Sequence, residues 1–135
     1  MRTRLSTLWI FVTLNYLYCD VISLMDAQLL RQYLTGTVDG LELNQGFLLG
    51  AAALIEIPIA MTLVSRLVTH HAANRWANLV AAAVMTLVQA ATLLMGTPAP
   101  YYAFFSVLEI GCTAAIAWQA WHWRVPEPAA ALVAA

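Results

Sequence analysis

Charged side chains are scarce in this chain, and the scarcity excludes an ordinary soluble domain. Of its 135 residues, 10% are charged and 62% are hydrophobic, whereas a soluble domain carries about 25% charged residues. So few charges could not cover the water-facing surface of a protein of this size. The net charge of -1 also excludes the broad positive field that a nucleic-acid-binding protein uses. The bilayer is therefore the natural solvent for most of the chain.

Motifs for cofactors and metals are also lacking. The sequence contains no zinc-binding spacing, no P-loop and no dinucleotide fingerprint, so we expect no cofactor and no metal site. The two cysteines, Cys19 and Cys112, fall inside apolar segments and form no CxxC pair. We interpret them as small hydrophobes in preference to a disulfide or redox pair. His70 and His71 occupy a short connector without a nearby acid, which favours a solvated loop over a metal or pH-sensing site.

Four long apolar stretches are present, and each has the length that a membrane span requires. A span needs roughly 20 mostly apolar residues at about 1.5 Å per residue. The candidate spans cover about 5–25, 46–68, 76–95 and 101–123. The sequence therefore predicts one all-α transmembrane domain over residues 1–135, a four-helix bundle whose short connections make neighbouring helices antiparallel. The Pro- and Ala-rich residues 125–135 are predicted to form a disordered tail.

The arginines predict the direction of the helices. Five of the six arginines fall on one side of the predicted membrane: Arg2, Arg4, Arg66, Arg75 and Arg124. Arg31 alone falls on the other side, in the longer connection over residues 26–45, whose first part we expect to extend the first helix or to lie as an interfacial helix. Because positive residues accumulate on the cytoplasmic side, we expect both termini in the cytoplasm of a multi-pass inner-membrane protein.

Three carboxylates lie inside the predicted spans. Asp20, Glu56 and Glu109 each cost at least ~2.5 kcal/mol at a helix centre, so such residues are functional candidates by default. Asp20 lies roughly 22 Å from the cytoplasmic end of its helix, and Glu56 and Glu109 lie roughly 15 Å and 12 Å below the outer surface. All three therefore fall in one layer between the midplane and the outer leaflet, which predicts one polar pocket.

Neutral polar side chains accompany the acids, but no Lys or Arg lies at their depth. Asn15 and Gln89 fall in or just below the same layer, and Tyr16 is one turn from Asp20. We expect at least one acid to be protonated at neutral pH through desolvation and like-charge proximity. This chemistry suits a proton relay, an amine-binding site or acid–base catalysis on a lipophilic substrate. The alternative is that each acid is protonated and only holds helices together.

The first-helix segment Leu-Asn-Tyr-Leu-Tyr-Cys-Asp, with the four spans and the chain length, resembles a family of small bacterial four-helix membrane proteins of unknown function. That resemblance covers most of the chain and implies no activity. Asp20 and Glu56-Ile57-Pro58 are similar in a weaker way to the sigma-2 receptor and sterol-isomerase superfamily. There a first-helix acid and a second-helix Glu shortly before Pro surround a lipophilic pocket. No histidine lies at the pocket depth here, so the likeness does not extend to isomerase chemistry.

Together these features favour a binding protein over an enzyme. The main hypothesis is an acidic pocket for a small lipophilic or cationic ligand, in which Asp20 and Glu56 are the principal ligand or proton groups and Glu109 tunes them. Asn15, Tyr16 and Gln89 are expected to supply neutral hydrogen bonds. One alternative is a proton-coupled transporter that works as a homo-oligomer, because four short helices enclose little space. Another is a non-catalytic accessory subunit of a larger membrane complex, in which the acids contact partner helices.

Overall fold

The computed structural model describes residues 1–94 and 97–124. Within them the chain forms five helices and one small hairpin, in the order α1 (Arg2–Ser23), α2 (Ala27–Thr35), β1 (Thr37–Val38), β2 (Leu41–Glu42), α3 (Gln45–Leu67), α4 (His71–Leu94) and α5 (Pro100–Trp121). All but α2 are long and apolar enough to cross a membrane, which confirms the predicted four-span, all-α fold. The last residue of the predicted third span and the predicted tail over 125–135 lie outside the described residues.

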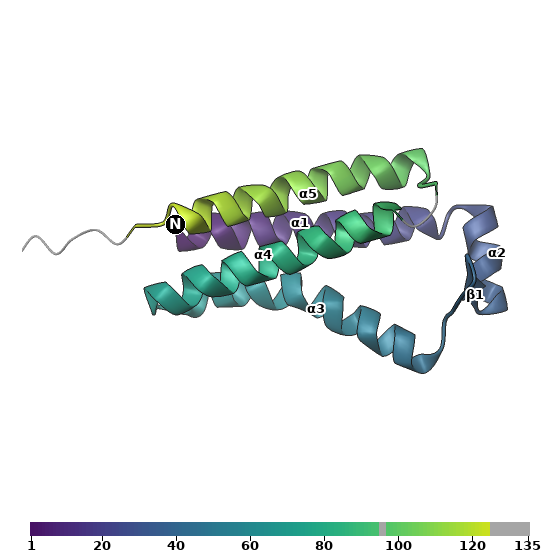
Figure 1. Ribbon diagram of the computed structural model, residues 1–135, viewed down its shortest axis with the longest axis horizontal. Helices are drawn as coiled ribbons and strands as arrows, with labels where there is room; N and C mark the ends of the chain where they lie inside the picture. Colours follow the sequence, from purple (N-terminus) through teal and green to yellow (C-terminus); the bar gives the residue numbers. More distant parts are fainter. Residues whose placement is uncertain (95–96, 125–135) are drawn as a thin grey trace, which may run out of the picture.

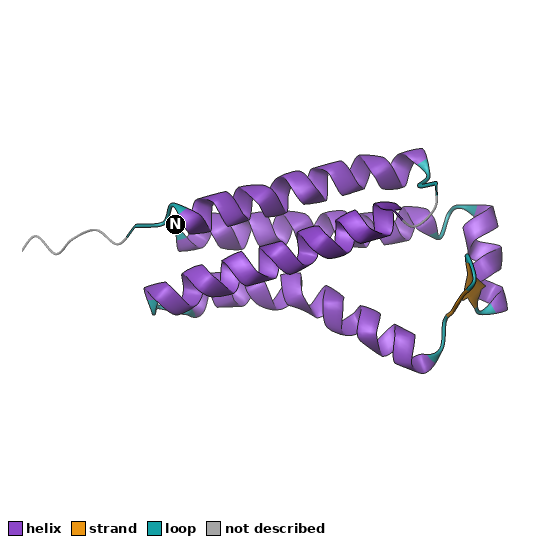
Figure 2. Cartoon of the chain, viewed as in Figure 1, coloured by secondary structure: helices purple, strands orange, loops and turns teal. Residues whose placement is uncertain are grey.

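The four long helices form an elongated bundle (Figure 1). In it α1 packs against α3 and α5, and α4 packs against α3 and α5. The start of α1, the α3–α4 connector and the end of α5 meet at one end, which we call the arginine-rich end because it carries Arg2, Arg4, Arg66, Arg75 and Arg124. The other end carries α2 and the two strands, and we call it the hairpin end (Figure 2). The side of the membrane that each end faces stays a prediction.

Local signals explain the ordered connection at the hairpin end. The carboxylate of Asp26 accepts hydrogen bonds from the backbone N–H groups of Gln28 at 2.9 Å and Leu29 at 3.3 Å, which caps α2 as a separate helix. Gly36 ends α2 in the left-handed conformation, with φ of 77°. Asp39 and Gly40 also have positive φ, 47° and 84°, the conformation that a two-residue hairpin turn requires. Asp39 and Gly40 therefore form the turn of the hairpin between β1 and β2.

A buried polar network closes the arginine-rich end. The indole N–H of Trp9 donates to Oδ1 of Asn78 at 2.7 Å, and the Ser65 hydroxyl donates to the same oxygen at 2.9 Å. The Asn78 amide donates to the backbone carbonyl and to Oδ1 of Asn74, both at 2.8 Å. Asn74 in turn donates to the carbonyls of Ser65 at 2.9 Å and Val68 at 2.8 Å, near the end of α3. This Asn78 network (Trp9, Ser65, Asn74 and Asn78) joins α1, α3 and α4.

The first half of α3, by contrast, is almost uncovered. Its buried residues are Pro58, Met61 and Ser65, all in the second half of the helix, and the residues from 45 to 56 are exposed except for a half-buried Ala51. Figure 1 shows this half turning away from the other long helices toward the hairpin end. Pro58 has no backbone N–H to donate to the carbonyl of Leu54, which permits a bend at this point. The bundle is therefore closed at one end and open at the other.

Candidate functional site: an acidic cavity between α1 and α3

A cavity of about 240 Å³ lies between α1 and α3, where α3 begins to leave the bundle. It is lined by Thr13, Tyr16, Leu17, Asp20, Ile55, Pro58 and Ile59. We call it the α1–α3 cavity. Its walls are mainly aliphatic, and Asp20 carries the one carboxyl group among these lining residues. Such a cavity can hold a small molecule that has both an apolar body and a positive charge.

Asp20 is positioned near the outer part of this cavity, one turn beyond Tyr16 on α1. The chain contains no lysine, and its six arginines lie in α2 or near the ends of the spans. Within the described residues no basic side chain forms an ion pair with Asp20. Burial, and secondly the negative charge of Asp20, raise the pKa of the Tyr33 phenol in α2. Asp20 therefore lies toward the hairpin end, within electrostatic reach of the outer connection.

Glu109 is enclosed in the bundle interior, with 0% of its surface exposed. Polar contacts hold α5 against α4 on both sides of it: the Gln89 amide donates to the Ser106 hydroxyl at 2.7 Å, and the hydroxyls of Thr86 and Thr113 are 2.7 Å apart. Glu109 itself is different, since neither carboxyl oxygen has a hydrogen-bond partner among the described residues. A buried acid without partners is costly when it is ionised, so its protonation state is open to control by its surroundings.

Tyr16 lies one turn before Asp20 on α1. Its ring lines the α1–α3 cavity, while its hydroxyl is buried and has no hydrogen-bond partner in the described part of the chain. The structure therefore brings together two of the predicted site residues, Asp20 and Tyr16, on the wall of one cavity, whereas Glu109 is buried on α5 and does not line it.

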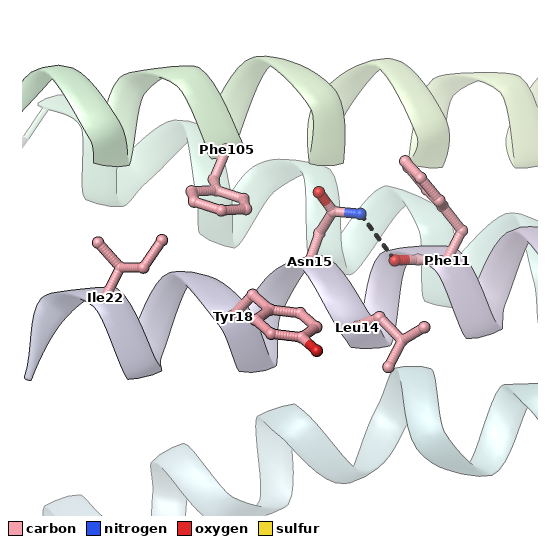
Figure 3. A pocket seen from close by; sticks show the side chains of 6 residues that line it. All are labelled: Phe11, Leu14, Asn15, Tyr18, Ile22 and Phe105. Atoms are coloured by element: carbon pink, nitrogen blue, oxygen red, sulfur yellow. Dashed lines mark hydrogen bonds between the residues drawn. The ribbon is translucent and has the colours of Figure 1, made fainter.

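Two predicted residues take other positions. The Asn15 amide donates to the carbonyl of Phe11 on its own helix at 2.8 Å. Figure 3 shows it facing α5, in a more open depression of about 270 Å³ that is lined by Phe11, Leu14, Asn15, Tyr18, Ile22 and Phe105. Gln89 uses its amide to bridge α4 and α5 through Ser106. Neither residue lines the α1–α3 cavity, and their roles as ligand groups stay a prediction.

Glu56 lies apart from the other acids. It is exposed, whereas Pro58, two residues later, is buried. Two residues span about 200° around a helix of 3.6 residues per turn, so the two side chains point in nearly opposite directions. Counting residues along each helix predicts a common depth for the three acids, but depth alone cannot tell which way a side chain points. Of the three acids, Asp20 lines the cavity, Glu109 is buried in the bundle interior and Glu56 lies on the exposed face of α3.

The sequence patterns described above predict neither the Asn78 network nor the aliphatic walls of the cavity. Asn74 and Asn78 offered a signal, because two amides four residues apart share one face of an otherwise apolar helix. Ile55 and Ile59 have the same spacing on α3. They resemble ordinary membrane-facing residues, so their place in a cavity follows only from the course of α3.

With the site described, comparison with known families gives a match over residues 1–130, nearly the whole chain. The chain belongs to DUF6326, a family of unknown function. The match confirms the resemblance to a family without an assigned activity, and the likeness to the sigma-2 receptor superfamily is not shown. No curated protein and no solved structure matches this DUF6326 chain.

Proposed function

We propose that this DUF6326 protein is a multi-pass protein of the bacterial inner membrane that binds a small lipophilic cation in the α1–α3 cavity. One observation carries the proposal: Asp20 lines a mainly aliphatic cavity in a chain whose spans offer it no basic partner. A carboxylate in such surroundings gains most from a cation that brings its own apolar body, because the body replaces water along the aliphatic walls while the charge pairs with the acid.

The cavity walls favour an amine or quaternary ammonium group in particular. Leu17, Ile55 and Ile59 provide apolar surface for a hydrocarbon body. The ring of Tyr16 lies beside Asp20 on the same helix face, where it can contact the cation through its π-system. A volume of about 240 Å³ is slightly below the usual range for drug-sized ligands, roughly 300–1,000 Å³, so the expected ligand is small.

The position of Glu56 favours a second candidate function. Its carboxyl group lies on the exposed face of α3 within a span, where it needs a partner if it is to be satisfied in a bilayer. A neighbouring helix, from a second copy or from a larger membrane complex, would supply that partner. In this alternative the chain is an accessory or oligomeric subunit, and Glu56 rather than Asp20 is its principal residue.

Binding of benzyltrimethylammonium to the purified protein in lipid nanodiscs tests the first proposal. Neopentylbenzene has nearly the same shape without the charge, so we expect it to compete poorly. We expect Asp20→Asn to weaken binding of the cation about tenfold or more, which corresponds to about 1.4 kcal/mol. Glu56→Gln is the matched control, since it removes an intramembrane acid that does not line the cavity, and we expect it to bind as the unmodified protein does.

The same titration can overturn the proposal. Equal affinity for the two compounds, or an Asp20→Asn variant that binds as tightly as the unmodified protein, would contradict a cation site at Asp20. If Glu56→Gln instead changes the oligomeric state in nanodiscs while Asp20→Asn changes nothing, the accessory or oligomeric function is the better one.

A further inference from the structure

We propose that the open depression between α1 and α5 binds a lipophilic phenol from the bilayer, and that Asn15 accepts a hydrogen bond from its hydroxyl. The ligand is a neutral aromatic ring with an O–H donor and an apolar tail. The depression, about 270 Å³ in volume, shares no lining residue with the α1–α3 cavity. This second site therefore goes beyond the proposed function and does not depend on it.

The side-chain oxygen of Asn15 carries the proposal. Asn15 is only 9% exposed, and its amide nitrogen donates to the carbonyl of Phe11 at 2.8 Å. No group in the described part of the chain donates a hydrogen bond to Oδ1. Figure 3 shows this oxygen turned toward α5, with the ring of Phe105 on one side and the ring of Phe11 on the other. In a hydrocarbon environment the oxygen gains a partner only when a donor enters the depression.

The depth of Asn15 restricts where that donor can come from. Asn15 follows Arg2, the first residue of α1, by 13 positions, so it lies roughly 20 Å along a span, inside the hydrocarbon core. Charged lipid head groups stay at the interface. Phe11, Leu14 and Tyr18 line the depression and are exposed on this span, which opens the depression sideways to the bilayer. The donor is therefore part of a molecule that dissolves in the hydrocarbon core.

The walls of the depression favour an aromatic ring. Phe11, Tyr18 and Phe105 are three of its six lining residues, and aromatic side chains pair well with another ring in offset-stacked or edge-to-face contact. A flat ring can also reach an oxygen that is nine-tenths buried between two rings, whereas a serine or threonine hydroxyl on a neighbouring helix stays close to its own backbone. The lining residues extend from Phe11 to Ile22, roughly 16 Å along α1, which leaves room for a tail.

A matched pair of fluorinated compounds tests the hydrogen bond. In para-(trifluoromethyl)toluene a methyl group replaces the hydroxyl of para-(trifluoromethyl)phenol, and fluorine NMR in lipid nanodiscs reports the binding of both, with protein-free nanodiscs giving the partition into lipid. We expect the phenol to bind about threefold to tenfold more tightly than the toluene, the effect of one net hydrogen bond. Equal affinity for the two compounds would overturn the proposal.

Displacement of the fluorinated phenol tests whether the ligand comes from the bilayer. At equal concentration in the lipid, we expect para-hexylphenol to displace it better than phenol itself, because the hexyl chain fills the remainder of the depression. Displacement by phenol and para-hexylphenol at the same concentration would overturn a membrane-borne ligand with a tail.

Asn15→Leu removes the acceptor at nearly constant size, and the Phe11 carbonyl keeps the backbone N–H that α-helix geometry provides. We expect this variant to lose the preference for the phenol and to bind benzyltrimethylammonium as the unmodified protein does. Thr7→Val is the matched control, since it removes an exposed hydroxyl from α1 outside the depression, and it should keep the preference. An undiminished preference in Asn15→Leu contradicts the site. If neither compound binds and Asn15→Leu separates an oligomer, a partner helix covers the depression and the phenol site is wrong.

Photolabelling locates the site in the unmodified sequence, even if Asn15→Leu fails to fold. We expect a phenol that carries a diazirine to label α1 and the part of α5 around Phe105, and para-(trifluoromethyl)phenol to prevent the labelling. Benzyltrimethylammonium should not prevent it, so a failure of the cation site leaves this result unchanged. No residue of α3 lines the depression; labelling of α3 in place of α5 would put the phenol in the α1–α3 cavity and overturn the proposal.

Discussion

Asn78 and Tyr16 are both polar side chains turned into the bundle, but their hydrogen-bonding situations are opposite. Asn78 accepts from Trp9 and Ser65 and donates to Asn74, so its removal would leave several buried groups without partners. The Tyr16 hydroxyl has no partner to lose among the described residues. The free energy of unfolding should therefore depend on the Asn78 side chain and hardly at all on the Tyr16 hydroxyl.

We expect Asn78→Ala to lower the free energy of unfolding by about 1–3 kcal/mol, because the Trp9 indole N–H and the Asn74 oxygens lose buried partners. Tyr16→Phe should change it by less than about 0.5 kcal/mol, since only an unpaired hydroxyl is removed. Reversible unfolding of the purified protein in mixed micelles measures both. Equal losses in the two variants would mean that the Tyr16 hydroxyl is paired in the folded protein.

At this scale the sequence predicts which residues matter better than where they point. Asp20 and Glu109 are candidates because an acid in an apolar span is rare and costly, and helix rise predicts their depth. The direction of Glu56 could not be obtained in this way, because it depends on which face of α3 meets α1. That face is set by Pro58, Met61 and Ser65, whose burial follows only from the packed bundle.

Among the elements, α3 decides the character of the site, because the cavity opens where its first half leaves the bundle. Its span, like the others, was predictable from apolar length, and the observed bounds differ from the predicted ones by a few residues. The path of α3 was not predictable, since a proline at position 58 indicates a bend without giving its direction. The separate helix α2 and the two-residue strands also followed from caps and turn residues that apolar length does not detect.

Pro58→Ala restores a backbone N–H that can bond to the Leu54 carbonyl, and we expect α3 to straighten toward the other helices. Because the arm from Gln45 to Ile57 is roughly 19 Å long, straightening a kink of about 20° moves its tip by about 6 Å. Spin labels on the exposed positions Leu49 and Val107, in a background without native cysteines, would report a shorter distance by pulsed electron paramagnetic resonance. Ile59→Ala trims the same cavity without adding an N–H and should leave the distance unchanged; a similar change in both variants would argue against the proline.

The whole molecule is asymmetric along its long axis. The arginine-rich end is closed by the Asn78 network, whereas the hairpin end is open between α1 and α3. A cation would therefore reach Asp20 from the hairpin end. If the arginines predict the orientation correctly, that end faces away from the cytoplasm, and the site samples the outer compartment.

Cysteine labelling in intact cells tests this orientation. We expect a cysteine at Glu42, an exposed residue of the hairpin, to react with a membrane-impermeant maleimide added outside. A cysteine at His70, exposed in the α3–α4 connector, should react only after the membrane is permeabilised. The opposite labelling pattern would mean that the protein has the reverse orientation in the membrane, with the cavity accessible from the cytoplasm.

The Asn78 network also has a consequence for the order in which the protein assembles during synthesis. The bond between Trp9 and Asn78 joins residues 69 positions apart, on the first and third spans. When α1 enters the bilayer, the Trp9 indole N–H has no partner, and it gains one only after α3 has followed and α4 has been inserted. Because spanning helices can insert individually before they associate, the Trp9 N–H stays without this partner until α4 is in the bilayer. The arrival of Asn74 and Asn78 on α4 then joins three inserted helices into one closed end, before α5 follows.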